Sequence, residues 1–120
     1  MTKKTLIIGG AGFIGMNIIQ GLGKKNNSVI TIADNFFRGK MDNDLSNLIK
    51  KYNVRVVSAD LTKFKNFEQL ENDYDQVYML ASVVGVEYTQ KIPNELIRVN
   101  TMLIMNTLEW LKNSNCKKVL

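Results

Sequence analysis

The segment 6–15, LIIGGAGFIG, constrains the fold most, because four glycines directly follow a run of aliphatic residues. Gly9, Gly12 and Gly15 stand three residues apart, between a predicted strand and a predicted helix. This pattern is typical of a dinucleotide-binding loop, in which the glycines permit a tight turn, close approach of a pyrophosphate and close packing of the helix. The N–H groups that begin the helix would then face phosphates. A glycine-rich turn without a ligand is the alternative.

The rest of the chain alternates short aliphatic runs with helical patterns, which indicates a parallel sheet with crossover helices. We predict strands over residues 5–9, 28–33, 54–58 and 76–80, and a last strand from Lys117. Helices are predicted over 13–22, 43–51, 66–71 and 94–112, with Pro93 in the first turn of the last one. The expected fold class is α/β, a doubly wound parallel sheet (Rossmann) with strand order 3-2-1-4-5.

Length and composition restrict the possible functions. Residues 1–120 suffice for one domain, and because the sequence stops within the fifth predicted strand, we expect a truncated one. The chain has no histidine and one cysteine, Cys116, which excludes Ser-His-Asp and Cys-His catalysis and a cysteine-cluster metal site. The net charge of +5 comes from dispersed lysines, which we interpret as a solvated surface. Without a signal or membrane segment, we expect a cytoplasmic protein that binds neither nucleic acid nor membranes.

Asp34 ends the second predicted strand, SVITIAD, and stands 19 residues after Gly15. An acidic side chain there can accept hydrogen bonds from the adenosine ribose and repel a 2′-phosphate, which favours NAD over NADP. Arg38 and Lys40 follow closely and would offset part of that repulsion. An aspartate that only forms a turn at the strand end is the alternative.

The chain resembles the N-terminal part of the extended short-chain dehydrogenase/reductase family, the NAD-dependent epimerases and dehydratases that act on nucleotide sugars. The resemblance covers nearly all 120 residues and rests on five signatures in order: GGAGFIG, DNFFRGK, ADLT, VYMLASVVGV and IRVNTMLIMNTLEWL. Leu103 and Ile104 depart from the Gly-Thr pair usual in the family's fourth helix.

The resemblance implies a set of cofactor-binding positions. They would contact, in chain order, the pyrophosphate, the adenosine ribose, the adenine and the nicotinamide half, and a polar residue of the long helix would point at the site. The residues are Gly9, Gly12, Phe13, Ile14, Gly15, Asp34, Asn35, Arg38, Gly39, Asp60, Leu61, Leu80, Ala81, Ser82 and Asn100. For Asp60, capping of the helix start near Lys63 is an equal alternative.

Family members catalyse with a Tyr-x-x-x-Lys pair, in which the tyrosine is the acid/base. None of the tyrosines Tyr52, Tyr74, Tyr78 and Tyr88 has a lysine four residues later, so this chain alone is expected to be inactive, with no catalytic residue and no metal site. The parent protein is expected to be a nucleotide-sugar epimerase, dehydratase or decarboxylase that works by transient hydride transfer to NAD.

The sequence allows two alternative functions to be compared with this one. A dinucleotide-binding or sensing module without chemistry is one alternative. A response-regulator receiver domain is disfavoured, because the first strand ends in glycines rather than in paired acids that could hold Mg²⁺.

The long helix over residues 94–112 predicts self-association. Its apolar residues surround it almost completely, whereas a helix on one sheet face needs a single apolar stripe. They are Leu96, Ile97, Val99, Met102, Leu103, Ile104, Met105, Leu108, Trp110 and Leu111. Helices absent from this sequence could cover the second face, but the resemblance favours a homodimer or larger assembly, with Leu103 and Trp110 as positions where a charge would test the interface.

Overall fold

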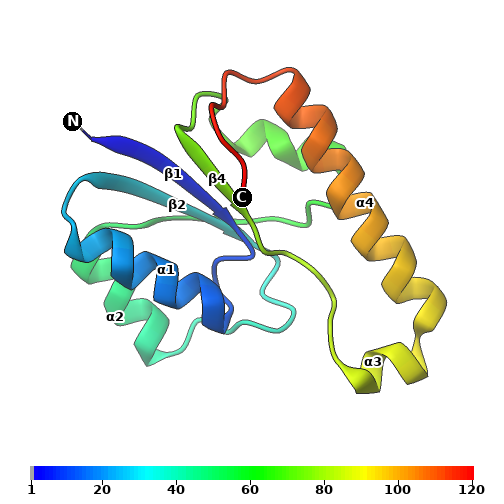
Figure 1. The fold of residues 1–120 in the computed structure, drawn as a ribbon. Helices are drawn as coiled ribbons and strands as arrows, with labels where there is room; N and C mark the ends of the chain where they lie inside the picture. The colour runs from blue at the N-terminus through cyan, green and yellow to red at the C-terminus, as the bar shows by residue number, and fades with distance from the viewer. Residues whose placement is uncertain (1) are drawn as a thin grey trace.

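The computed structural model describes residues 2–120 and contains a four-stranded parallel sheet in the order β3-β2-β1-β4 (Figure 1). The strands are β1 (Lys3–Ile8), β2 (Ser28–Asp34), β3 (Arg55–Ser58) and β4 (Gln76–Met79). The helices are α1 (Phe13–Lys24), α2 (Asn43–Tyr52), α3 (Val86–Lys91) and α4 (Pro93–Lys112), with a 3₁₀ helix η1 (Phe64–Gln69). The predicted Rossmann class and the order of the first four strands are confirmed.

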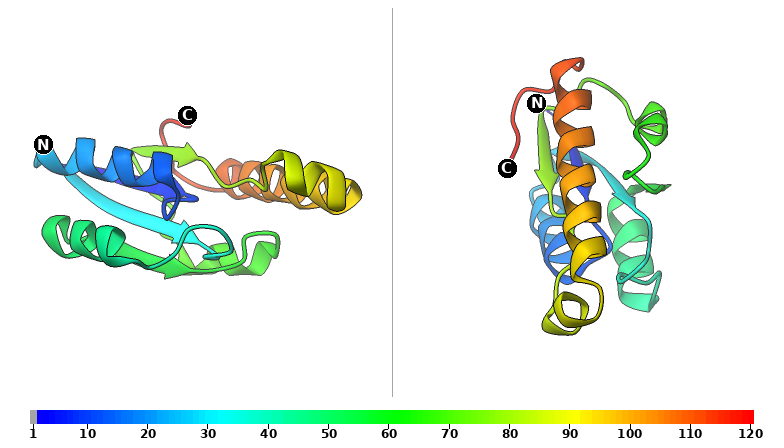
Figure 2. Two further views of the ribbon diagram at one scale, coloured as in Figure 1. Left: turned by 90° about the horizontal axis from the view of Figure 1, so that it is seen from below. Right: turned by 90° about the vertical axis from the view of Figure 1, so that its right-hand side faces the viewer.

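Apolar side chains cover both faces of the sheet, because successive residues of a strand point to opposite sides. Leu6 and Ile8 of β1 join a core that includes residues of η1 and α4. Ile7, between them, joins a second core with residues of α1 and α2. In Figures 1 and 2, α1 and α2 lie side by side and α4 lies apart from them. The sheet is therefore covered on both faces, as a parallel sheet requires.

Two segments differ from the prediction. Residues 64–69 form a 3₁₀ helix, not the predicted helix over 66–71, and Phe64 and Phe67, three residues apart, bring their rings to 5.8 Å. Residues 86–91, expected as a loop, form α3, in which Lys91 and Glu87 pair across one turn at 2.6 Å. Both segments are too short for hydrophobic periodicity to reveal them.

The C-terminal segment takes the place of the predicted fifth strand. Val119 forms a parallel β-bridge with Val77, and the Met79 N–H donates to the Leu120 carbonyl at 2.9 Å. The last residues therefore lie beside β4, at the position that the order 3-2-1-4-5 requires, as an isolated bridge rather than a strand.

Helix α4 has a buried face and an exposed apolar face. Leu103 and Trp110 are buried, and the Trp110 ring lies 5.5 Å from that of Phe67, so the prediction that these two positions belong to an exposed interface is wrong. The predicted second apolar face is confirmed on the other side of the helix. It consists of the exposed side chains of Ile97, Ile104, Met105 and Leu108, of which Ile104 and Met105 lie about two turns after Ile97 and Leu108 lies one turn further on.

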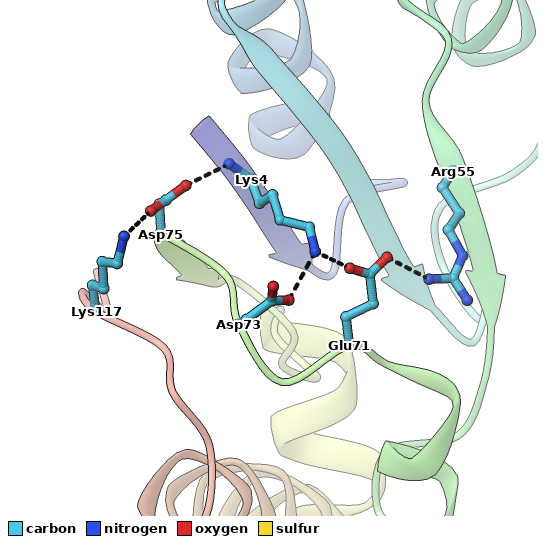
Figure 3. Close-up of polar contacts among 6 residues, drawn as sticks. All are labelled: Lys4, Arg55, Glu71, Asp73, Asp75 and Lys117. Atoms are coloured by element: carbon cyan, nitrogen blue, oxygen red, sulfur yellow. Dashed lines mark hydrogen bonds and ion pairs between the residues drawn. The ribbon is translucent and has the colours of Figure 1, made fainter. Parts of the chain in front are cut away.

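Ion pairs connect segments at the end of the sheet where the strands begin (Figure 3). Lys4 of β1 pairs with Glu71 and with Asp73, the latter at 2.8 Å, and these bonds hold the pKa of the Lys4 ammonium above its ordinary value. Lys117 pairs with Asp75 at 2.6 Å and lowers the pKa of that carboxyl. This network attaches the C-terminal segment near β4, at the end of the sheet opposite the loops that follow the strands.

Candidate functional site

A cleft of about 680 Å³ opens at the carboxyl ends of the strands. Its walls are the loops that follow β1, β2, β3 and β4, and Val99 and Leu103 of α4 close one side. In an open parallel sheet, ligands bind in this crevice, where neighbouring connections leave for opposite faces. The volume lies within the range of small-molecule and cofactor sites.

The cleft brings together most of the residues singled out from the sequence. Thirteen of them line it: Gly9, Gly12, Phe13, Ile14, Gly15, Asp34, Asn35, Arg38, Gly39, Leu61, Leu80, Ala81 and Ser82. Asp60 and Asn100 are not part of the lining. Further wall residues were not among the cofactor-binding positions expected from the sequence, although all but Asp42 lie within the five signatures: Lys40, Asp42, Thr62, Val84 and Leu103.

The three glycines of the loop have different physical roles. Gly9 has φ +86°, and a Cβ there would lie 2.6 Å from the Ala81 nitrogen. A Cβ on Gly15 would lie 2.5 Å from the Gly10 carbonyl oxygen, so this glycine lets α1 pack against the loop. At Gly12 the nearest atom to a Cβ would be the Gly9 oxygen at 3.7 Å, an ordinary contact. Packing within the chain therefore does not require glycine at position 12, whereas a ligand approaching the backbone would.

The N-terminus of α1 offers free donors to the cleft. Gly12 is the N-cap, no side chain caps the helix, and its first turn contains no acidic residue. Among the described residues, the amides of Phe13 and Ile14 have no hydrogen-bond acceptor. Unpaired N–H groups and the positive end of the helix dipole together attract an anion such as a pyrophosphate.

Asp34 connects the glycine loop with the loop after β2. Its Oδ2 accepts the Ala11 N–H at 3.0 Å, and its Oδ1 accepts the Phe36 N–H at 2.8 Å. The second bond helps to hold Phe36 at φ +57°. The side chain thus forms a turn, as one interpretation of the sequence held, and also lines the cleft, where each oxygen keeps a further lone pair for a ligand hydroxyl.

The loop after β2 crosses to the loop after β4. Arg38 Nη1 donates to the Val84 carbonyl at 2.9 Å, and the Phe37 and Tyr88 rings lie 5.9 Å apart. A Cβ on Gly39 would lie 2.4 Å from the Ala11 carbonyl oxygen, so this loop also rests on the glycine loop. Arg38 is therefore directed at a backbone carbonyl of the opposite wall.

Asp60 and Asn100 act on the backbone around the cleft. Asp60 Oδ1 accepts the N–H and the hydroxyl of Thr62, at 3.0 and 2.6 Å, and so caps the turn before η1. Asn100 Oδ1 accepts the Val83 N–H at 2.7 Å, while its Nδ2 donates to the Val83 carbonyl at 2.9 Å. Both side chains position loops whose other residues line the cleft.

Residues 2–120 contain neither a candidate membrane span nor a candidate metal site. None of the helices in this range has the length and apolar composition needed to cross a membrane. Within the same range, no three side chains of His, Cys, Asp or Glu gather closely enough to hold a metal ion.

Comparison with known proteins places the sequence in a family. Residues 5–120 match the model of the NAD dependent epimerase/dehydratase family. Over 106 residues the chain is 35% identical to UDP-N-acetyl-alpha-D-glucosaminuronate decarboxylase of Bacillus cytotoxicus, a match that covers 83% of this chain and 30% of that protein. The resemblance inferred from the five signatures is thereby confirmed.

Solved structures of related enzymes share the fold. UDP-N-acetylglucosamine 4-epimerase from Methanobrevibacter ruminantium, in complex with UDP-N-acetylmuramic acid, is 30% identical with a TM-score of 0.82, over 98% of this chain and 36% of that one. The Bordetella bronchiseptica enzyme WbmF in complex with NAD⁺ is 25% identical, also with a TM-score of 0.82, over 98% and 35% of the two chains. This chain thus spans about a third of the length of the proteins it matches.

Proposed function

This chain belongs to the NAD dependent epimerase/dehydratase family, and we propose that it is the NAD-binding Rossmann part of an enzyme that modifies a nucleotide sugar. One observation carries the proposal: the bare Cα of Gly12, the uncapped start of α1 and the Asp34 carboxylate all face one cleft at the switch point of the sheet. These are the groups that a dinucleotide's pyrophosphate and ribose require.

Each part of the cleft suits one part of the cofactor. The amides of Phe13 and Ile14 would bind the pyrophosphate, and Asp34 with Asn35 would accept the ribose hydroxyls of adenosine. Leu61 would lie beside the adenine. On the other side of the glycine loop, the backbone of 80–82 would border the nicotinamide half.

When bound in this cleft, NAD would supply the hydride acceptor for oxidation of the sugar and the hydride donor for its later reduction. The described residues would bind the cofactor and fix its position in the cleft. They would not supply the acid/base pair, because the tyrosine–lysine spacing typical of the family is absent from these 120 residues. UDP-sugars are the proposed substrate class of the complete enzyme, since the relatives compared above carry UDP-sugars in their names. Epimerisation, dehydration and decarboxylation are the proposed reaction classes.

A dinucleotide-binding module without chemistry is the alternative function. The uncapped helix and the Gly12 position would serve such a module equally well. The two differ in turnover: an enzyme containing this part converts a UDP-sugar in the presence of NAD, whereas a sensing module binds NAD and leaves the sugar unchanged.

We also propose that the protein self-associates through α4, as a homodimer or larger assembly. Ile97, Ile104, Met105 and Leu108 are each more than half exposed and form one stripe along the helix. A stripe of this kind gains free energy when a second copy covers it.

The proposed function is tested by comparing two glycine substitutions in α1 or at its start. Gly12→Ala adds a methyl group that the protein accommodates but that would occupy the space of the pyrophosphate, so NAD affinity should fall by about a hundredfold, the order expected when a close ion contact is blocked. Gly21→Ala is the matched control, because a Cβ there meets nothing within 4 Å. Titration calorimetry with NAD measures both. Equal affinities of the two variants would overturn the proposal.

A further inference from the structure

Two asparagines of α4 hold the backbone of two different cleft loops. Asn106 Nδ2 donates to the carbonyls of Leu61 and Thr62, at 3.0 and 2.8 Å, in the loop after β3. Asn100 bonds both the N–H and the carbonyl of Val83, in the loop after β4. Both side chains are half-buried. One helix therefore fixes both loops through side-chain amides.

The loop after β4 depends on side chains for its position. Within residues 81–84, the described structure gives the backbone three hydrogen bonds, two to Asn100 and one to Arg38. In the loop after β3, the carbonyls of Leu61 and Thr62 bond the single amide of Asn106. Because backbone groups without ladder partners find several conformations, these amides select one of them.

The two loops stand at opposite ends of the cleft. In the order β3-β2-β1-β4, β3 lies on the far side of β2, and β4 lies on the other side of β1. Asp34 ends β2, and the glycine loop follows β1. A dinucleotide with its pyrophosphate at the glycine loop and its adenosine ribose at Asp34 must place the adenine toward β3 and the nicotinamide toward β4.

We propose that Asn106 and Asn100 are positioning residues with separate roles: Asn106 sets the adenosine half of the cleft through residues 61–62, and Asn100 sets the nicotinamide half through Val83. The inference rests on the proposed function, since it assigns the two ends of the cleft to the two halves of NAD. Neither side chain lines the cleft, so both act through the backbone that they hold.

ADP and NAD separate the two roles in titration calorimetry, because ADP contains the adenosine and the pyrophosphate but lacks the nicotinamide riboside. Asn106→Ala should weaken both ligands by a similar factor of about tenfold, as expected for the loss of two hydrogen bonds. Asn100→Ala should weaken NAD by about tenfold and leave ADP binding unchanged. Asn113→Ala is the matched control: Asn113 lies just beyond the end of α4, and within residues 2–120 its side chain bonds only Glu109, so both affinities should stay as they are.

Asn106→Asp tests whether the side chain acts as a donor. It keeps the shape of Asn106, but its carboxylate would face two carbonyl oxygens, so ADP affinity should fall further than in Asn106→Ala. A loss equal to that of alanine or smaller would contradict the role.

Amide hydrogen exchange without ligand provides a second readout that does not depend on NAD. Exchange should rise at Thr62 and Lys63 in Asn106→Ala, and at Val83 in Asn100→Ala, each without change at the other loop. Equal losses of ADP and NAD in both variants, or exchange that rises at both loops together, would overturn the inference alone. An unmodified protein that binds neither ADP nor NAD would overturn the proposed function and, with it, this inference.

Discussion

At Asp34, one carboxylate has both a structural and a proposed binding role. Its two oxygens accept the N–H groups of Ala11 and Phe36, so the side chain holds the glycine loop and the loop after β2 together. It also borders the cleft, where its negative charge would oppose a 2′-phosphate. Removing the side chain would thus change loop structure and cofactor choice at once, and a substitution of the same shape, which keeps one of the two acceptor oxygens, is the cleaner test.

Asp34→Asn should reduce the preference for NAD over NADP. The amide keeps the shape of the carboxylate and one acceptor oxygen but removes the charge, so the ratio of the two affinities should fall by about tenfold or more, because two charges a few ångström apart interact by about 1 kcal/mol in water and by several times that near a protein surface. Titration calorimetry with NAD and NADP measures the ratio. Asp44→Asn, in the exposed first turn of α2, makes the same charge change as a control. Stronger binding of NADP than of NAD by the unmodified protein would refute the role of Asp34.

Residues with a motif could be predicted from the sequence, and residues defined by contacts could not. The glycine spacing and the acid at the end of β2 follow from local rules of chain geometry, and these residues line the cleft. The roles of Asn100 and Asn106 depend on which carbonyls α4 meets after folding. A buried asparagine needs hydrogen-bond partners, but the sequence contains no signal that identifies them.

Among the elements, helix α4 shows what hydrophobic periodicity can and cannot predict. Its apolar residues correctly indicated two apolar faces, but they could not show which residues belong to which face. Trp110 and Leu103 pack in the core, because the chain brings η1 and β1 against that side of the helix. Element α3 was not predicted, and η1 was predicted as a helix over 66–71, for a related reason: six residues are too few to establish a period.

Ile104→Glu combined with Leu108→Glu should convert the assembly into a monomer. Both side chains are more than half exposed in the single chain, so the charges cost little there but would be buried when a second copy covers the stripe. Sedimentation equilibrium at micromolar concentration should give a dimer or larger species for the unmodified protein.

Asn17→Glu combined with Gln20→Glu serves as the control for self-association, since it adds two charges to exposed positions of α1. This variant should sediment like the unmodified protein. A monomeric unmodified protein would contradict self-association. An assembly that persists in the α4 variant would place the interface elsewhere.

At the scale of the whole molecule, the two ends of the parallel strands differ in chemistry. The end of the sheet where the strands begin carries paired charges, with Lys4 paired to Asp73 and Lys117 paired to Asp75 (Figure 3). The end of the sheet where the strands end carries unpaired amide donors and the Asp34 carboxylate around a cleft. Groups that are already paired bind a ligand weakly, so we expect NAD at the end of the sheet where the strands end.

The fold class and strand order followed from the sequence because a strand–glycine loop–helix start and right-handed crossovers leave few topologies. The volume of the cleft and the contact between Arg38 and Val84 did not follow, since both depend on how loops distant in sequence pack together.

The most direct test of NAD binding in this cleft is an NMR titration of the ¹⁵N-labelled protein with NAD, followed through backbone amide shifts. We expect the largest shifts at the amides of Phe13 and Ile14 and at Asn35, and no change at Lys4 and Asp75 at the opposite end of the sheet. Amide spectra unchanged at millimolar NAD, or shifts that are largest at the end of the sheet where the strands begin, would contradict NAD binding in this cleft.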